Sequence, residues 1–202
     1  MLAALRVLRR AAVQFERYSW LFILANLLAV VLCLPIITAP GAYAGLSRLN
    51  HVAQTEIAAS YSDFWAGFRE HFWRGIVLGI SNLVVLGMLW VNFRYFSDQP
   101  GLMFVTLRTV WTIILIVWVG IQFYLWPILD EMEQPDLRGA FYNASIMFFQ
   151  NPVFSLTLLT VIAVIVVLSM VLVVPWLLLT ESVVACVANA AVLDRLGAFR
   201  GK

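Results

Sequence analysis

One acidic residue, Glu181, lies within an otherwise uncharged stretch that runs from residue 153 to residue 193. An ionisable side chain in such apolar surroundings is costly, so it is a candidate functional residue. Glu181 either reaches an aqueous surface or turns inward, where we expect it to pair with a polar side chain. The expected partners are Arg94, Arg108, Asn82 and Asn189.

A polar strip occupies the segment from Ser47 to Glu56. Arg48, His51 and Thr55 share one helical face, because residues three and four apart are neighbours on a helix. Such a face could bind a polar ligand, but a helix face in contact with water carries the same residue types and is the favoured interpretation. Arg48 and His51 are therefore kept as candidate residues of a polar path, together with Glu181, Asn82 and Asn189.

A third candidate feature is the segment from Pro35 to Gly45, which holds two prolines and two glycines. These residues break a helix, and broken helices form substrate sites in many transporters. The favoured alternative is structural: Pro40 starts the next helix, and Gly41 and Gly45 allow it to pack closely. The candidate broken-helix residues are Pro35, Pro40 and Gly41.

No catalytic, cofactor-binding or metal-binding residues can be assigned from the sequence. His51 and His71 are twenty residues apart, and neither has a second ligand residue at helical spacing. Nucleophile motifs, phosphate-binding loops and dinucleotide fingerprints are also absent from the sequence. We therefore expect a protein that is not an enzyme and uses no cofactor.

The composition identifies the environment in which these residues must work. Of the 202 residues, 63% are hydrophobic and 12% are charged, with a mean hydropathy of +0.92. A soluble domain has about 25% charged residues, and a net charge of +2 offers no cationic excess for nucleic acid. These values exclude an ordinary soluble protein and indicate an integral membrane protein.

Gaps between charged residues predict the membrane spans, since a span needs about 20 apolar residues. The sequence predicts an all-α fold, a polytopic transmembrane helix bundle in one domain over residues 1–202. Pro175 divides the last apolar stretch, so the chain should reverse there and Leu193 should return to the side where Val153 starts. A four-span protein with one long kinked helix is the alternative. The five expected spans are 20–38, 75–96, 109–128, 153–174 and 176–193.

Two amphipathic helices are expected at the membrane interface, over residues 61–74 and 136–150. In the first, Phe64, Phe68 and Phe72 share an inward face. Each helix precedes two spans, so residues 62–126 and 135–193 could be a parallel repeat, although coincidence explains the match equally well.

Three sequence segments resemble the YesL family of bacterial integral membrane proteins, whose function is undetermined. They are residues 26–28 (Asn-Leu-Leu), residues 34–45 from Leu34 to Gly45, and Asp63-Phe64-Trp65 with the residues that follow. The family usually has Gly-Pro-Ala where this chain has Ala39-Pro40-Gly41-Ala42. The resemblance implies an association with carbohydrate uptake and degradation, and it supplies no catalytic residues.

Together, these features predict a multi-pass protein of the bacterial cytoplasmic membrane that assists the uptake of carbohydrate or another solute. The alternative is a non-transporting accessory or structural subunit of a larger membrane complex. Transport requires a water-accessible cavity near Glu181 or the broken segment, whereas an accessory role requires filled space there and an exposed apolar patch elsewhere. The expected partners are the lipid bilayer and either a membrane transporter complex or a second copy in a homo-oligomer, with no nucleic acid.

Overall fold

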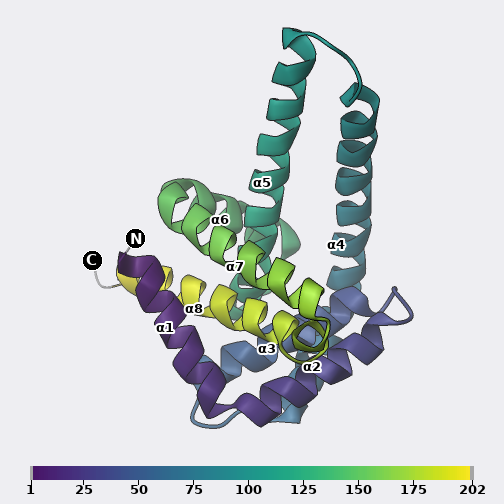
Figure 1. Ribbon diagram of the computed structural model, residues 1–202. Helices are drawn as coiled ribbons and strands as arrows, with labels where there is room; N and C mark the ends of the chain where they lie inside the picture. The colour runs from purple at the N-terminus through teal and green to yellow at the C-terminus, as the bar shows by residue number, and fades with distance from the viewer. Residues whose placement is uncertain (1, 201–202) are drawn as a thin grey trace.

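The computed structural model describes residues 2–200, which form eight α-helices and one π-helical segment with no strand among them (Figure 1). The predicted all-α fold is confirmed. The helices are α1 (Leu2–Arg17), α2 (Ser19–Cys33), α3 (Ala39–Thr55), α4 (Tyr61–Phe96), α5 (Leu102–Glu131), α6 (Leu137–Gln150), α7 (Pro152–Leu172) and α8 (Glu181–Arg200), with the π-helical segment η1 (Trp176–Thr180) directly before α8.

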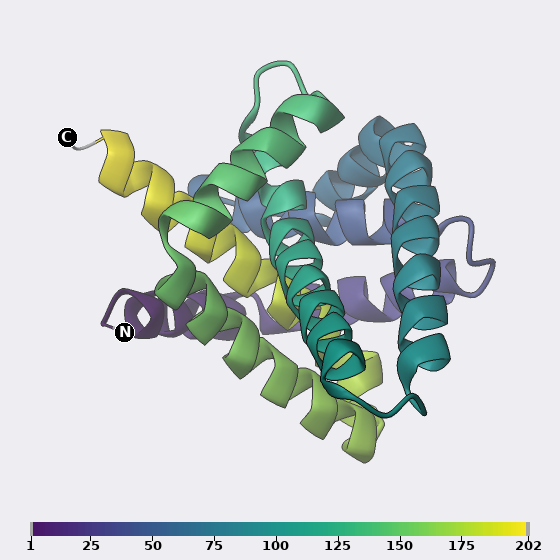
Figure 2. The ribbon, with the colours of Figure 1, turned by 90° about the horizontal axis from the view of Figure 1, so that it is seen from above.

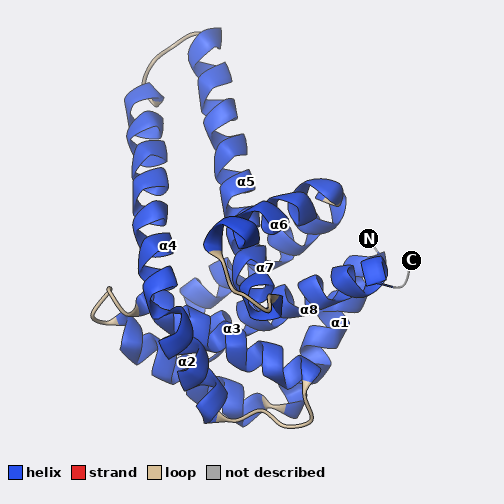
Figure 3. Ribbon diagram, turned by 180° about the vertical axis from the view of Figure 1, so that it is seen from behind, coloured by secondary structure: helices blue, strands red, loops and turns tan. Residues whose placement is uncertain are grey.

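Among residues 2–200, four helical segments are long and apolar enough to cross a membrane: α4, α5, α7 and the joined segment Trp176–Phe199. A fifth span exists if α1 and α2 count as one broken span, since they meet at an angle of 91°. This arrangement supports a multi-pass membrane protein. The α4–α5 hairpin rises above the other helices as a separate arm (Figures 1 and 3).

The structure differs from the sequence prediction at the first amphipathic helix. Residues 61–74 and the expected span 75–96 belong to one continuous helix, α4. No proline lies between Tyr61 and Phe96, so the backbone hydrogen bonds of the helix continue past Arg74 and Gly75. The second amphipathic segment is a separate helix, α6, which starts where Asp136 accepts a hydrogen bond from the Gly139 N–H.

Glycines allow α3 and α4 to pack in close contact. A β-carbon added at Gly45 would lie 2.8 Å from the Phe64 carbonyl oxygen, and one at Gly41 would lie 3.1 Å from the Phe68 and Phe72 rings. The aromatic face of α4 is therefore turned inward onto α3, and Phe64 is fully buried. This packing supports the structural interpretation of the segment from Pro35 to Gly45.

The chain also breaks before α3 and before α8. Residues 34–38 join α2 to α3, and Pro40 lies in the first turn of α3, where its missing N–H has no effect. Between α7 and η1 the chain reverses direction, in agreement with the expected reversal near Pro175. The Arg195 guanidinium then lies 3.8 Å from the Phe154 ring centroid, so the end of α8 returns to the start of α7 (Figure 2).

Helix α8 is the centre of the bundle. All residues from Ala185 to Val192 are buried, and α1, α2, α3 and α5 pack around them. On the outer edge, α1 and the last turns of α8 lie together, with Arg6 3.9 Å from Asp194 (Figure 3). Ser182 and Asn189 on this central helix are fully buried, away from both lipid and water.

Candidate functional site

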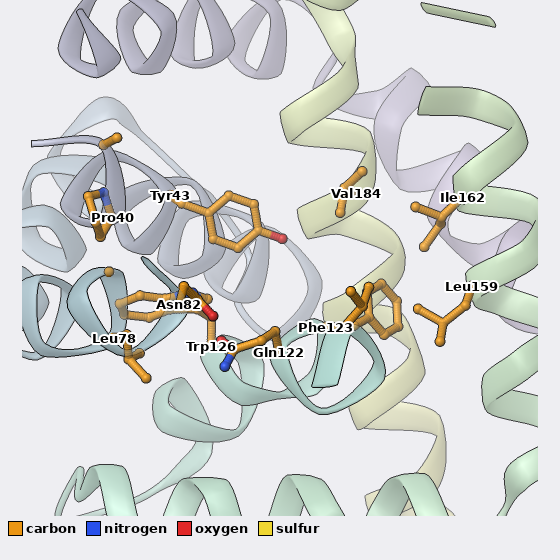
Figure 4. A pocket seen from close by; sticks show the side chains of 13 residues that line it. Pro40, Tyr43, Leu78, Asn82, Gln122, Phe123, Trp126, Leu159, Ile162 and Val184 are labelled. Carbon is orange, nitrogen blue, oxygen red and sulfur yellow. The ribbon is translucent and has the colours of Figure 1, made fainter. Parts of the chain in front are cut away.

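A cavity of about 350 Å³ lies between α3, α4, α5, α7 and α8 (Figure 4). The residues that line it include Ala39 and Pro40 at the start of α3, directly after the connection from α2. They also include Val184, four residues after the end of η1. Its polar and aromatic side chains are Tyr43, Asn82, Gln122, Phe123 and Trp126.

Two amides supply the polar groups of this cavity. The Asn82 Oδ1 accepts a hydrogen bond of 2.8 Å from the Trp118 indole, so the amide is held in one orientation. The Gln122 Nε2 is buried, and no residue that the structure describes accepts a hydrogen bond from it. A buried donor without an acceptor is destabilising. Gln122 is therefore suited to bind a ligand that carries an oxygen acceptor.

Two aromatic side chains form a flat apolar surface beside these amides. The Tyr43 and Trp126 ring centroids are 6.5 Å apart, with their planes inclined at 57°. Desolvation between the helices raises the pKa of the Tyr43 hydroxyl, and the Glu181 carboxylate adds to this shift. Tyr43 therefore stays protonated and can both donate and accept a hydrogen bond.

A second polar group is buried behind Trp126. The His71 ring centroid is 6.1 Å from that of Trp126, and the His71 Nε2 lies 3.6 Å from Asp130 Oδ1. Ser47 donates a hydrogen bond of 2.7 Å to Asp130 Oδ2. The side chains of His71 and Asp130 are each only 1% exposed. This group joins α3, α4 and α5, and its His71 ring contacts Trp126 of the cavity wall.

The structure places some of the sequence-predicted residues in the cavity and others outside it. Asn82 and Pro40 line the cavity. Gly41 packs on the Phe68 and Phe72 rings, and Pro35 is exposed in the connection before α3.

The other two candidates on α3, Arg48 and His51, contact neighbouring helices and do not line the cavity. The stem of Arg48 packs against Gly67 of α4, and His51 Nδ1 lies 3.8 Å from Glu131 Oε1 of α5. The side chains of the predicted polar strip on α3 thus face two different neighbouring helices, α4 and α5.

The expected pairing of Glu181 is not formed within the described residues. Arg108 donates to the Ser97 carbonyl at the tip of the α4–α5 hairpin, which projects away from α8. Asn82 is bonded to Trp118, and Asn189 donates to the Ser47 and Ala185 carbonyls. None of the four expected partners, Arg94 included, forms a hydrogen bond or ion pair with Glu181 in the described part of the chain. For the two arginines, the prediction assumed that helix ends on one side of the membrane also lie close together in the plane.

Sequence reasoning missed Gln122, Tyr43 and Trp126 in the cavity, and the contact between His71 and Asp130. One signal was available for Gln122, because it is an amide in the apolar run of α5, where a polar residue indicates a functional position. The other residues carried no such signal. Their proximity depends on how α3, α4 and α5 meet.

Comparison with family models gave one match, to the family described as "Protein of unknown function, DUF624", over residues 19–93. This segment of the chain is therefore similar to the DUF624 family. YesL-like proteins carry the DUF624 domain. The DUF624 segment covers α2, α3 and most of α4, and it contains the cavity residues Pro40, Tyr43 and Asn82. Searches of curated proteins and of solved structures gave no match.

Proposed function

We propose that this is a bacterial cytoplasmic-membrane protein of the YesL family that binds a small polar solute, such as a carbohydrate, and assists its uptake. The observation that carries the proposal is the cavity with the unpartnered Gln122 amide facing Asn82, Tyr43 and Trp126. Small-molecule sites combine apolar and aromatic walls with a few polar groups that fix the orientation of the ligand. Amides and aromatic rings together fit a sugar, which has hydroxyl groups on its rim and an apolar face.

The position of the cavity also supports uptake. Its wall includes Pro40, which follows the break between α2 and α3, and Val184, which follows η1. Interrupted helices beside a cavity are the usual setting of a transporter substrate site. The YesL resemblance adds the carbohydrate association, and the proposed role includes no enzymatic step.

A second candidate function, an accessory subunit of a membrane complex, is favoured by the α4–α5 arm. Leu83 and Trp90 of α4 are 73% and 68% exposed, and Ile113 of α5 is 55% exposed. These side chains are covered either by lipid or by the helices of another membrane protein. An accessory role does not require the cavity, so measurement of ligand binding separates the two functions.

The test is equilibrium binding by the purified protein in phosphatidylcholine nanodiscs. Thermal unfolding and tryptophan fluorescence are recorded with a panel of mono- and disaccharides, and with amino acids as polar solutes of another class. We expect saturable binding of at least one saccharide. Substitution Gln122→Leu should weaken it roughly 3- to 10-fold, since one neutral hydrogen bond contributes about 1 kcal/mol.

Asn92→Leu is the matched control. Asn92 is an amide on α4, like Asn82, but it donates to the Met88 carbonyl of its own helix and does not line the cavity. This variant should bind as the unmodified protein does. If no saccharide binds, or if Gln122→Leu and Asn92→Leu weaken binding equally, the proposed site is wrong.

A further inference from the structure

Four buried side-chain oxygens lack a hydrogen-bond donor among the residues that the structure describes, and one of them is Gln54 Oε1. The other three are Asn50 Oδ1, Asp130 Oδ1 and Asn189 Oδ1. Asn50 and Asn189 are fully buried, and the Asp130 side chain is 1% exposed. Buried oxygens almost always have a donor, an ordered water or an ion as a partner. The group therefore indicates a ligand.

Ser47 brings these residues together. Its hydroxyl donates to Asp130 Oδ2 at 2.7 Å, and its carbonyl accepts from Asn189 Nδ2 at 3.2 Å. The Asn189 amide is thereby held against the Ser47 backbone, while its oxygen has no donor among the described residues. Asn50 follows Ser47 by one helical turn on α3. Ser47 thus links α3, α5 and α8 at one buried place, and each of these three helices carries a buried oxygen without a donor in the described part of the chain.

The charged groups around this place leave the carboxylate without a cation in direct contact. Helix α4 contributes His71, whose Nδ1 accepts a hydrogen bond of 3.1 Å from Arg74. A guanidinium can only donate, so Nδ1 is the acceptor, and Nε2 is the His71 nitrogen that faces Asp130 Oδ1, at 3.6 Å, which is longer than a hydrogen bond. Arg74 itself is separated from Asp130 by the width of this ring. Helix α5 adds a second carboxylate, Glu131, which lies 3.8 Å from His51 of α3.

We propose that Asp130, Asn50, Asn189 and Ser47 form a binding site for a monovalent alkali cation, Na⁺ or K⁺. Such hard cations take carboxylate, amide, hydroxyl and carbonyl oxygens as ligands. One carboxylate balances one positive charge, whereas protein sites for Ca²⁺ generally use several carboxylates. The described residues contain no group of three or more His, Cys, Asp or Glu side chains that could hold a transition metal.

The site is separate from the proposed solute cavity, because none of these four residues lines that cavity. Its existence therefore does not depend on the proposed function. A cation bound here joins three helices that contact one another only in the folded protein. Binding should stabilise the folded state in proportion to the logarithm of cation concentration above the dissociation constant.

The experiment is thermal unfolding of the purified protein in phosphatidylcholine nanodiscs, in equal concentrations of NaCl, KCl and choline chloride. We expect the unfolding midpoint to be higher in Na⁺ or K⁺ than in choline, by a difference that grows with the logarithm of the salt concentration. Both Asp130→Asn and Asn189→Leu should abolish this difference. Asp136→Asn is the control: Asp136 caps α6, and asparagine is an equally good cap, so the response to the cation should remain.

Direct binding decides the question if the Asp130→Asn variant does not fold. Equilibrium dialysis of the unmodified protein with radioactive Na⁺, and with Rb⁺ as a tracer for K⁺, should reach about one ion per chain. Equal midpoints in all three salts, or no saturable binding of either ion, would overturn the proposal. A midpoint that responds to pH through Asp130 but to neither cation would assign a proton to the site and would also overturn it.

Discussion

The side chain of Asn26 caps the first turn of α8: its Oδ1 accepts a hydrogen bond of 2.8 Å from the Ser182 N–H. The other end of the same amide donates to the Leu177 carbonyl in η1, also at 2.8 Å. Asn26 is fully buried on α2. One side chain thus satisfies backbone groups on both sides of the junction between the π-helical segment and α8.

Replacing this amide should destabilise the fold. Asn26→Leu keeps the approximate volume but leaves a buried N–H and a buried carbonyl without partners, each at about 1–3 kcal/mol. We expect the free energy of unfolding in denaturing detergent to fall by about 2–4 kcal/mol. Asn92→Leu, where the amide bonds only to its own helix, should change it by less than about 1 kcal/mol. Equal losses in both variants would contradict the capping role.

Gly45 should tolerate no side chain. A β-carbon there would lie 2.8 Å from the Phe64 carbonyl oxygen, so Gly45→Ala must push α3 and α4 apart. The expected loss of unfolding free energy is about 1–3 kcal/mol. Gly87→Ala on the exposed arm is the comparison, since its β-carbon meets nothing within 4 Å. That variant should gain up to about 1 kcal/mol from helix propensity; a gain in Gly45→Ala would refute the close contact.

Replacing Val173 with glycine should stabilise the folded protein. Its φ of 58° and ψ of −53° are unfavourable for a β-branched residue, with strain of about 1–3 kcal/mol. Glycine loses more backbone entropy on folding, so we expect Val173→Gly to gain about 1 kcal/mol overall, measured as a rise in the thermal midpoint. Val171→Gly, two residues earlier within α7, should instead lose about 1 kcal/mol. A loss in both variants would show that Val173 is not strained.

Tyr43 should make the stability depend on pH in the alkaline range. Its pKa is raised in the folded protein, whereas an unfolded tyrosine ionises near pH 10. Its contribution is therefore complete below about pH 10 and is lost as the pH rises further, because only the unfolded state releases the proton. The midpoint should fall less steeply between pH 9 and 11 in Tyr43→Phe. Tyr142→Phe, at an exposed position, should keep the original slope; equal slopes in all three proteins would contradict the prediction.

The sequence was sufficient for features set by local chemistry. Pro175 lacks an N–H and divides a stretch too long for one span, so the reversal before α8 could be predicted. The glycines at 41 and 45 similarly indicated a close helix contact. The continuity of α4 was missed because the charged residues from Arg69 to Arg74 were interpreted as a boundary, although charge alone does not end a helix.

The candidate site could be predicted only in part. Asn82 was selected as an expected partner of Glu181, and Pro40 was selected as part of a helix break. Gln122 and Trp126 line the cavity only because α5 packs beside α3 and α4 with one particular rotation. The assumed pairing of Glu181 failed for the same reason. Helix order along the chain does not determine which helices are neighbours.

The projecting α4–α5 hairpin has a consequence for biogenesis. Its two helices are complete by residue 131, whereas the cavity wall and Asn189 also require α7 and α8, which the ribosome makes last. We therefore expect the hairpin to enter the bilayer during translation, as a unit, before any binding site exists. Nascent chains truncated after α6 should be membrane-integrated yet unable to bind a solute or a cation. The order of synthesis thus delays the assembly of both sites until the last helix is inserted.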